Sequence, residues 1–108
     1  MVMAGQPQFE RSGSPVRFGR IVPETGDTTT NFEFVAIPPD TGVATTGEYR
    51  WAFRHQTRHF LIQTPWQRSP RSTQRFDHAG LYEATYEYRR DDGTGTSVYT
   101  AGDVVVKP

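Results

Sequence analysis

The chain has 108 residues, of which 34% are hydrophobic, and its 12 basic and 12 acidic residues give a formal net charge of zero. It contains no cysteine, which excludes a disulfide scaffold, Cys-ligated zinc, iron–sulfur clusters and a cysteine nucleophile. Zero net charge argues against a general nucleic-acid binder, and no apolar run approaches the roughly 18 residues of a membrane helix.

Residues 1–15 differ in composition from the rest of the chain. Gly, Pro, Ser and Gln dominate them and predict an extended N-terminal arm. Gly5, Gln6 and Pro7 interrupt any apolar core of a secretory signal, so the sequence reads as a non-exported product or as an excised domain. We therefore expect an arm over 1–15 and one folded domain over 16–108.

Short runs with period-two alternation recur along the domain, separated by turn residues. In chain order, the runs that predict strands are Val16–Val22, Asn31–Ile37, Glu48–Arg54, Arg58–Gln63, Leu81–Arg89 and Thr96–Val106. Residues 23–30 read as a turn, residues 64–75 as a loop, and residues 91–95 as a hairpin connection with an Asp-Gly signal. A bulge is expected at Gly102. This spacing predicts an all-β antiparallel sandwich of about seven strands.

The alternation also assigns each side chain of these runs to a face. One face of the runs is aromatic and apolar, and the other carries charged and small residues. The side chains expected in the core on this ground are Phe34, Tyr49, Trp51, Phe53, Tyr82, Ala84 and Tyr86.

Two stretches go beyond a general β pattern. Residues 49–53 read Tyr-Arg-Trp-Ala-Phe, and in residues 74–86 Phe76 stands four residues before Gly80-Leu81-Tyr82-Glu83-Ala84. They resemble the immunoglobulin-like domain of the polycystic-kidney-disease (PKD) type, which carries Tyr-x-Trp-x-Phe on its third strand and an aromatic residue before a later Gly-x-Tyr-x-Val. The family's Gly-Asp-Gly turn is Arg54-His55-Gln56 here.

The resemblance adds Phe76 and Gly80 to the expected structural core. Tyr82 would bury its ring and return its hydroxyl group to a nearby backbone group, as a tyrosine corner, and Gly80 would permit the tight corner that places it. The resemblance implies an adhesive or structural module that is not an enzyme.

No set of residues predicts catalysis or metal binding. His55 and His59 would lie about 13 Å apart on a strand, too far for one metal ion, so the sequence reads His55, His59 and His78 as surface or loop residues. Asp91 and Asp92 precede a hairpin glycine, where turn chemistry explains them. We therefore expect no catalytic residues, no metal and no cofactor.

Charge is distributed unevenly along the chain. Residues 49–76 hold six arginines and no acidic residue, so all 12 acidic residues lie elsewhere. Arginine with exposed aromatic groups is typical of protein interfaces. The residues predicted to bind a partner are Arg50, Arg54, Arg58, Trp66, Arg68, Arg71 and Arg75.

Three interpretations of this basic segment stay open at this point. The arginines are paired with Glu83 and Glu87 across a solvated sheet, or they meet an acidic protein partner, or they follow a single-stranded nucleic acid. The zero net charge disfavours the last of the three.

The resulting hypothesis is a non-catalytic structural or interaction module. By analogy with free-standing immunoglobulin-like proteins of tailed-phage virions, we expect a capsid decoration or a tail or fibre component. It would assemble in the host cytoplasm and dock through its arm and the Arg/aromatic surface on a capsid or tail protein or on copies of itself, with no membrane involved. The alternative is a carbohydrate- or cell-surface-binding adhesion module of a larger extracellular protein, with Trp66 stacking on a sugar.

Overall fold

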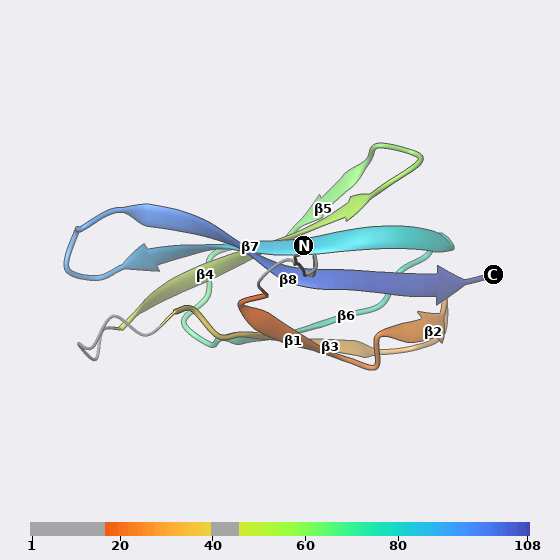
Figure 1. The fold of residues 1–108 in the computed structure, drawn as a ribbon, viewed down its shortest axis with the longest axis horizontal. Helices are drawn as coiled ribbons and strands as arrows, with labels where there is room; N and C mark the ends of the chain where they lie inside the picture. The colour runs from red at the N-terminus through yellow and green to blue at the C-terminus, as the bar shows by residue number, and fades with distance from the viewer. Residues whose placement is uncertain (1–16, 40–45) are drawn as a thin grey trace, which may run out of the picture.

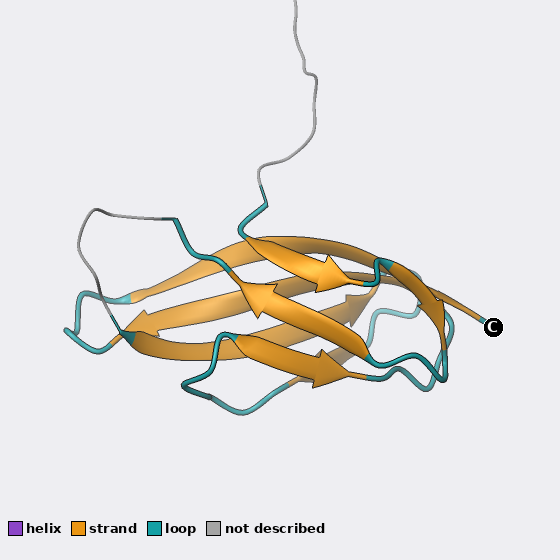
Figure 2. Ribbon diagram, turned by 90° about the horizontal axis from the view of Figure 1, so that it is seen from below, coloured by secondary structure: helices purple, strands orange, loops and turns teal. Residues whose placement is uncertain are grey.

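The computed structural model describes residues 17–39 and 46–108, and in these ranges the chain is all-β, with eight strands in two sheets (Figure 1). The predicted arm over 1–15 and Val16, the first residue of the first predicted strand, lie outside the described residues. The two sheets form two layers, with the smaller sheet in front of the larger one in Figure 2.

The smaller sheet is antiparallel throughout. Its strands, in spatial order, are β1 (Gly19–Val22), β3 (Phe32–Ala36) and β6 (Arg71–Gln74). The sequence predicts a loop over 64–75, and this is wrong for β6. The strand escapes the pattern because all of its residues are polar, and it forms by pairing with β3, where Ser72 lies opposite the buried Phe34.

The larger sheet holds the remaining strands. Their spatial order is β2 (Thr25–Asp27), β8 (Thr96–Lys107), β7 (Gly80–Arg90), β4 (Gly47–His55) and β5 (Leu61–Gln63). The sandwich is not antiparallel throughout, because β2 runs parallel to β8. The sequence predicts a turn over residues 23–30, and this is wrong for β2. The composition of β2 gives no strand signal, and the segment becomes a strand only by pairing with the last strand of the chain.

A long antiparallel ladder of β4, β7 and β8 forms the centre of the larger sheet. Its register shifts between Ala84 and Thr85, which lie opposite Gly102 and Thr100, so that Ala101 is the extra residue of a bulge. Gly102 has a φ of 143° in this bulge, a conformation that glycine adopts without strain. The irregularity expected at Gly102 is present.

The core lies between the two sheets and is mainly aromatic. The largest side chains that are completely buried are Trp51, Tyr82, Tyr86, Phe32, Phe34, Phe53 and Phe76, with Val104 and Val106. Phe34 of the smaller sheet packs on Phe53 of the larger one with ring centroids 4.6 Å apart. Ala84 is also fully buried, and the half-buried Tyr49 stacks on Tyr88 at 5.0 Å. The contact of Phe34 with Phe53 joins the two layers, and the chain has no cysteine for a disulfide.

A hydrogen-bonded corner closes the sandwich where β7 begins. The Tyr82 hydroxyl donates to the backbone oxygen of His78 at 2.6 Å, the geometry expected of a tyrosine corner. Gly80, with a φ of 146°, passes directly under the ring of His55, so close that a Cβ there would lie 2.2 Å from His55 Nε2.

His55 is not a surface or loop residue, as the sequence suggested. Its side chain is only 2% exposed, at the end of β4. Nε2 donates to the carbonyl oxygen of Ala79 at 2.9 Å, and Nδ1 accepts from the backbone N–H of Arg58 at 3.0 Å. Because the first partner only accepts and the second only donates, the neutral ring with its proton on Nε2 is held in place. The imidazole is therefore a structural part of the corner.

Candidate functional site

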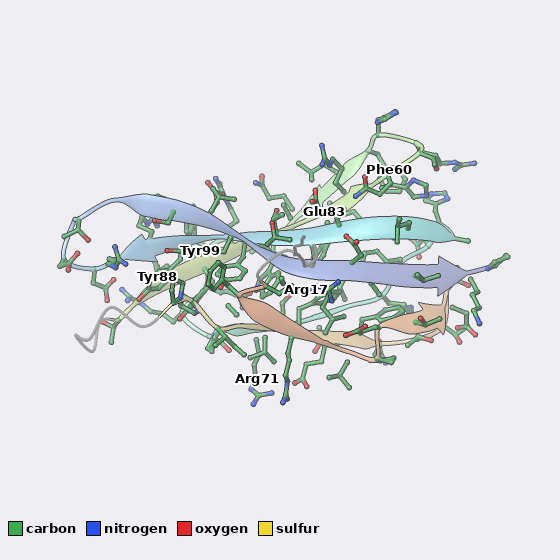
Figure 3. The ribbon with its side chains drawn as sticks, in the orientation of Figure 1. Arg17, Phe60, Arg71, Glu83, Tyr88 and Tyr99 are labelled. Carbon is green, nitrogen blue, oxygen red and sulfur yellow. The ribbon has the colours of Figure 1, made fainter. Side chains whose placement is uncertain are left out.

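The seven residues predicted to bind a partner do not form one surface. Arg50 and Arg54 project from the outer face of β4, with Trp66 and Arg68 beside them in the connection that follows β5. Arg71 projects from the smaller sheet, on the side of the sandwich opposite to Glu83 (Figure 3). Arg58 lies in the β4–β5 connection and Arg75 follows β6.

Arg50 and Arg54 pair with glutamates across the sheet. The register places Arg50 opposite Glu87 and Arg54 opposite Glu83. Arg50 Nε lies 2.6 Å from Glu87 Oε1, and Arg54 Nη2 lies 2.7 Å from Glu83 Oε1. Of the three interpretations of the basic segment, the cross-strand pairing therefore holds for these two arginines. Arg71 is also paired, 2.9 Å from Glu33 on the smaller sheet.

A third pair extends this row of ions. Arg89 Nη2 donates to Glu48 Oε1 at 2.5 Å, and the two residues are again opposite each other in the β4–β7 register. We call the outward side chains of β4 and β7 the charged face; its members are Glu48, Arg50, Ala52, Arg54, Glu83, Thr85, Glu87 and Arg89. The face carries three arginines and three glutamates and is therefore neutral overall. In each charged row, that is, each pair of residues opposite each other, one strand contributes the arginine and the other the glutamate.

Trp66 stands at the edge of the charged face under two guanidinium groups. The Arg89 guanidinium lies 4.0 Å from the ring centroid and the Arg50 guanidinium 4.7 Å, both within cation–π range. The Trp66 side chain is partly buried. A sugar stacking on this ring would have to displace a guanidinium group that is also bound to a glutamate.

Arg68 ties the neighbouring loops to one end of the charged face. Its Nη1 donates to both carboxylate oxygens of Asp91, at 2.6 and 2.8 Å, and the Thr46 hydroxyl donates to the same carboxylate at 2.7 Å. These bonds, that of Thr46 first, hold the pKa of Asp91 below its usual range. Asp91 raises the pKa of Arg68 in turn. All three residues are exposed, so the bonds orient the loops more than they stabilise them.

Exposed apolar side chains gather on the outer side of the same sheet. Of the six large apolar side chains that the described residues leave exposed, four project from it: Leu61, Leu81, Val98 and Val105. Val98 is the most open, with 66% of its surface exposed, and it lies directly opposite Glu87. The outer face of the larger sheet thus combines ordered ion pairs with exposed apolar side chains.

At the end of the sandwich where β7 begins, away from Arg68 and Asp91, the surface has a shallow, open depression of about 410 Å³. Thr28, Arg58, Asp77, His78, Ala79 and Pro108 line it. Arg58 Nη1 lies 3.5 Å from His78 Nδ1, at the limit of a hydrogen bond. This depression brings together one cation, one carboxylate and one imidazole, but no hydroxyl nucleophile bonded to a base among its described residues.

In the described ranges, no group of three His, Cys, Asp or Glu side chains is placed to hold a metal ion. The same residues include no helix of the length and apolarity that a membrane span requires. The chain matches no model of a known protein family, and no relative is found among curated proteins.

Several residues of the charged face were not singled out from the sequence. Arg89 covers Trp66 and pairs with Glu48, and Val98 is the most exposed apolar side chain beside the face. The period-two alternation of residues 81–89 contains the signal for Arg89, because it puts this residue on the same side as Glu83 and Glu87. The sequence contains no such signal for Asp91, because its contact with Arg68 joins two loops that have no alternation to follow.

Proposed function

We propose that the protein is a non-catalytic interaction module with an immunoglobulin-like sandwich of the PKD type. Two features support this fold type. The first is the division into β1-β3-β6 and β2-β8-β7-β4-β5, with β2 parallel to the last strand. The second is the tyrosine corner of Tyr82, where β7 begins. Because fold type alone does not give function, the surface carries the rest of the proposal.

The module docks on a protein through the charged face. The observation that carries this is the coincidence, on one sheet, of three ordered ion pairs, a tryptophan held under two arginines, and four of the six large apolar side chains that are exposed in the described ranges. Arginine and tryptophan are enriched among the residues that dominate binding energy. Among the described residues, the outer side of the smaller sheet has one ion pair, between Arg71 and Glu33.

The setting that we propose is a larger protein assembly, with a virion as the sequence-based hypothesis. A docking module needs a rigid scaffold under its contact residues, and β4 and β7 supply one because their inner sides are anchored in the aromatic core. The sugar-binding alternative receives less support, since the guanidinium groups of Arg50 and Arg89 already occupy positions over Trp66.

Site-specific photo-cross-linking tests the docking proposal. A benzophenone amino acid replaces Leu61, an exposed side chain beside Arg54 at the rim of the charged face, in the cell that naturally carries the protein. Irradiation should give covalent protein adducts heavier than the 12.3 kDa chain. The matched control carries the same group at Thr73, which lies on the outer side of the smaller sheet, and it should give none. Equal adducts at both positions, or none at Leu61, would contradict the proposal.

A further inference from the structure

We infer that the partner of the charged face is a second copy of this chain, stacked face to face on it in a twofold dimer. This inference rests on the proposed docking function and names its occupant. It comes from the register of the ion pairs, which lets the face pair all three of its charged rows with a second copy of itself.

The charges of the face lie in three rows, each with one arginine and one glutamate on opposite strands. In the two rows that flank Ala52 and Thr85, β4 contributes Arg50 and Arg54. In the same rows β7 contributes the glutamates that pair with these arginines, at 2.6 and 2.7 Å. In the outer row of Glu48 and Arg89 the signs are exchanged. Each row thus has a positive and a negative end.

A twofold axis that lies in the interface plane, parallel to the strands and midway between β4 and β7, places β4 of one copy over β7 of the other. Every residue then faces, in the second copy, the residue type that it pairs with in its own chain. Arg50 faces a glutamate, Arg54 faces a glutamate, and Glu48 faces an arginine. All three rows are attractive across the interface.

Other twofold arrangements of the same face bring like charges together or leave a charged row unpaired. An axis parallel to the strands but centred on β4 places Arg50 over its own copy, and one centred on β7 places Glu87 over its own copy. An axis perpendicular to the strands through the row of Ala52 places Arg50 over Arg54. Perpendicular axes nearer to the row of Arg50 pair opposite charges in part of the face but leave one charged row without a charged partner. The axis between β4 and β7 pairs all three charged rows, so electrostatics favours it.

The uncharged parts of the face suit the same axis. Ala52 and Thr85 form the central row, and their small side chains let two sheets approach to the usual spacing of about 10 Å. Trp66 precedes Gln67, which bridges to Tyr49, so it lies beside Arg50 at the β5 edge. Val98 lies beyond Glu87 on β8, in the corresponding row. The axis therefore puts Val98 of one copy over the cluster of Trp66 and its guanidinium groups in the other, whereas Leu61 at the corner faces Asp103 and gains nothing.

Sedimentation of charge-reversed variants tests this arrangement. Variant one carries Arg50→Glu and Arg54→Glu, and variant two carries Glu83→Arg and Glu87→Arg. The unchanged protein should approach the mass of two chains as its concentration rises, while each variant alone stays near the 12.3 kDa of one chain. An equimolar mixture should regain the double mass, because the acidic β4 of variant one then faces the basic β7 of variant two.

The matched control carries Arg20→Glu and Arg71→Glu, which changes net charge as variant one does but on the outer side of the smaller sheet, around Val35. It should dimerise like the unchanged protein. Circular dichroism checks that each variant is folded. If a reversal prevents folding, Ala52→Arg blocks the central row instead and should also give single chains.

Three results would overturn the inference: an unchanged protein that stays a single chain at all concentrations, variants that still dimerise alone, or a mixture that fails to associate. The cross-linking at position 61 separates this failure from that of the proposed function. Adducts with a different protein would keep the docking proposal and remove the second copy as its partner, and the absence of adducts would remove both.

Discussion

The two sides of the β4–β7 ladder differ completely in chemistry although they share one backbone. The inner side contributes only aromatic, apolar and imidazole groups to the core: Tyr49, Trp51, Phe53, His55, Tyr82, Ala84, Tyr86 and Tyr88. The outer side consists of three ion pairs and one row of small residues. We infer that the inner side determines the stability of the fold and the outer side determines binding. A substitution on one side should therefore leave the contacts of the other side in place.

The largest expected effect is on the inner side. Trp51→Ala should lower the free energy of unfolding by about 3–5 kcal/mol, because it removes a completely buried indole that packs on Phe34 and Tyr86. Urea denaturation followed by circular dichroism measures the loss. A loss no larger than that of a substitution at an exposed position would contradict the assignment of Trp51 to the core.

Gly80→Ala should also damage the inner side, through the corner at the start of β7. The new Cβ would lie 2.2 Å from His55 Nε2 on a backbone with a φ of 146°, and clash and strain together should cost about 3 kcal/mol.

Gly93→Ala is the control for Gly80→Ala. Gly93 also has a positive φ, 78°, but a Cβ there would meet nothing within 4 Å, so about 1 kcal/mol of backbone strain remains. Equal losses in melting experiments would show that His55 does not limit the space beneath it.

Tyr86 gives the inner side a dependence on alkaline pH. Burial raises the pKa of this hydroxyl above the ordinary 10.0, and the hydroxyl donates to the backbone oxygen of Phe18. Because the pKa of Tyr86 is higher in the folded than in the unfolded state, the contribution of its hydroxyl to the free energy of unfolding is complete below pH 10. This contribution is lost as pH rises further. Tyr86→Phe should be about 1 kcal/mol less stable than the unchanged protein near pH 8.

That deficit should shrink when urea denaturation is repeated near pH 11, since the unfolded unchanged chain ionises Tyr86 and the variant cannot. Tyr49 and Tyr82 also have a raised pKa, but they are present in both proteins and cancel in the difference. A deficit that is the same at both pH values would mean that burial does not set the pKa of Tyr86.

The smallest expected effect on stability is on the outer side. Arg54→Ala breaks an ion pair whose arginine side chain is 58% exposed and should cost about 0.5 kcal/mol in thermal unfolding. Arg50→Ala should cost more, about 1 kcal/mol, because Arg50 is less exposed and also covers Trp66. If either loss approaches that of Trp51→Ala, the outer side is part of the stabilising core and the separation of roles is wrong.

The sequence predicts the two sides of this ladder because β4 and β7 are long and alternate cleanly. The same method misses β2 and β6, whose three and four residues become strands only through their neighbours β8 and β3. It also misplaces His55, because its backbone and ring partners come from the β4–β5 and β6–β7 connections.

For the candidate site, composition finds the arginines but not their grouping. Arg50 and Arg71 are close in sequence, yet the connection from β5 to β6 carries the chain from one sheet to the other and places them on opposite outer sides. Local sequence contains no signal for this crossover. The glutamate partners on β7 follow from alternation once the register of β4 and β7 is known.

The central claim is that the outer side of β4 and β7 joins two copies of this chain. The most direct test is a concentration series of amide chemical shifts, recorded by NMR on the unchanged protein. The account predicts shifts that grow with concentration around Ala52 and Thr85 and leave Val35 and Thr73 of the smaller sheet unmoved. Shifts centred on the smaller sheet, or no shifts at any concentration, would contradict it.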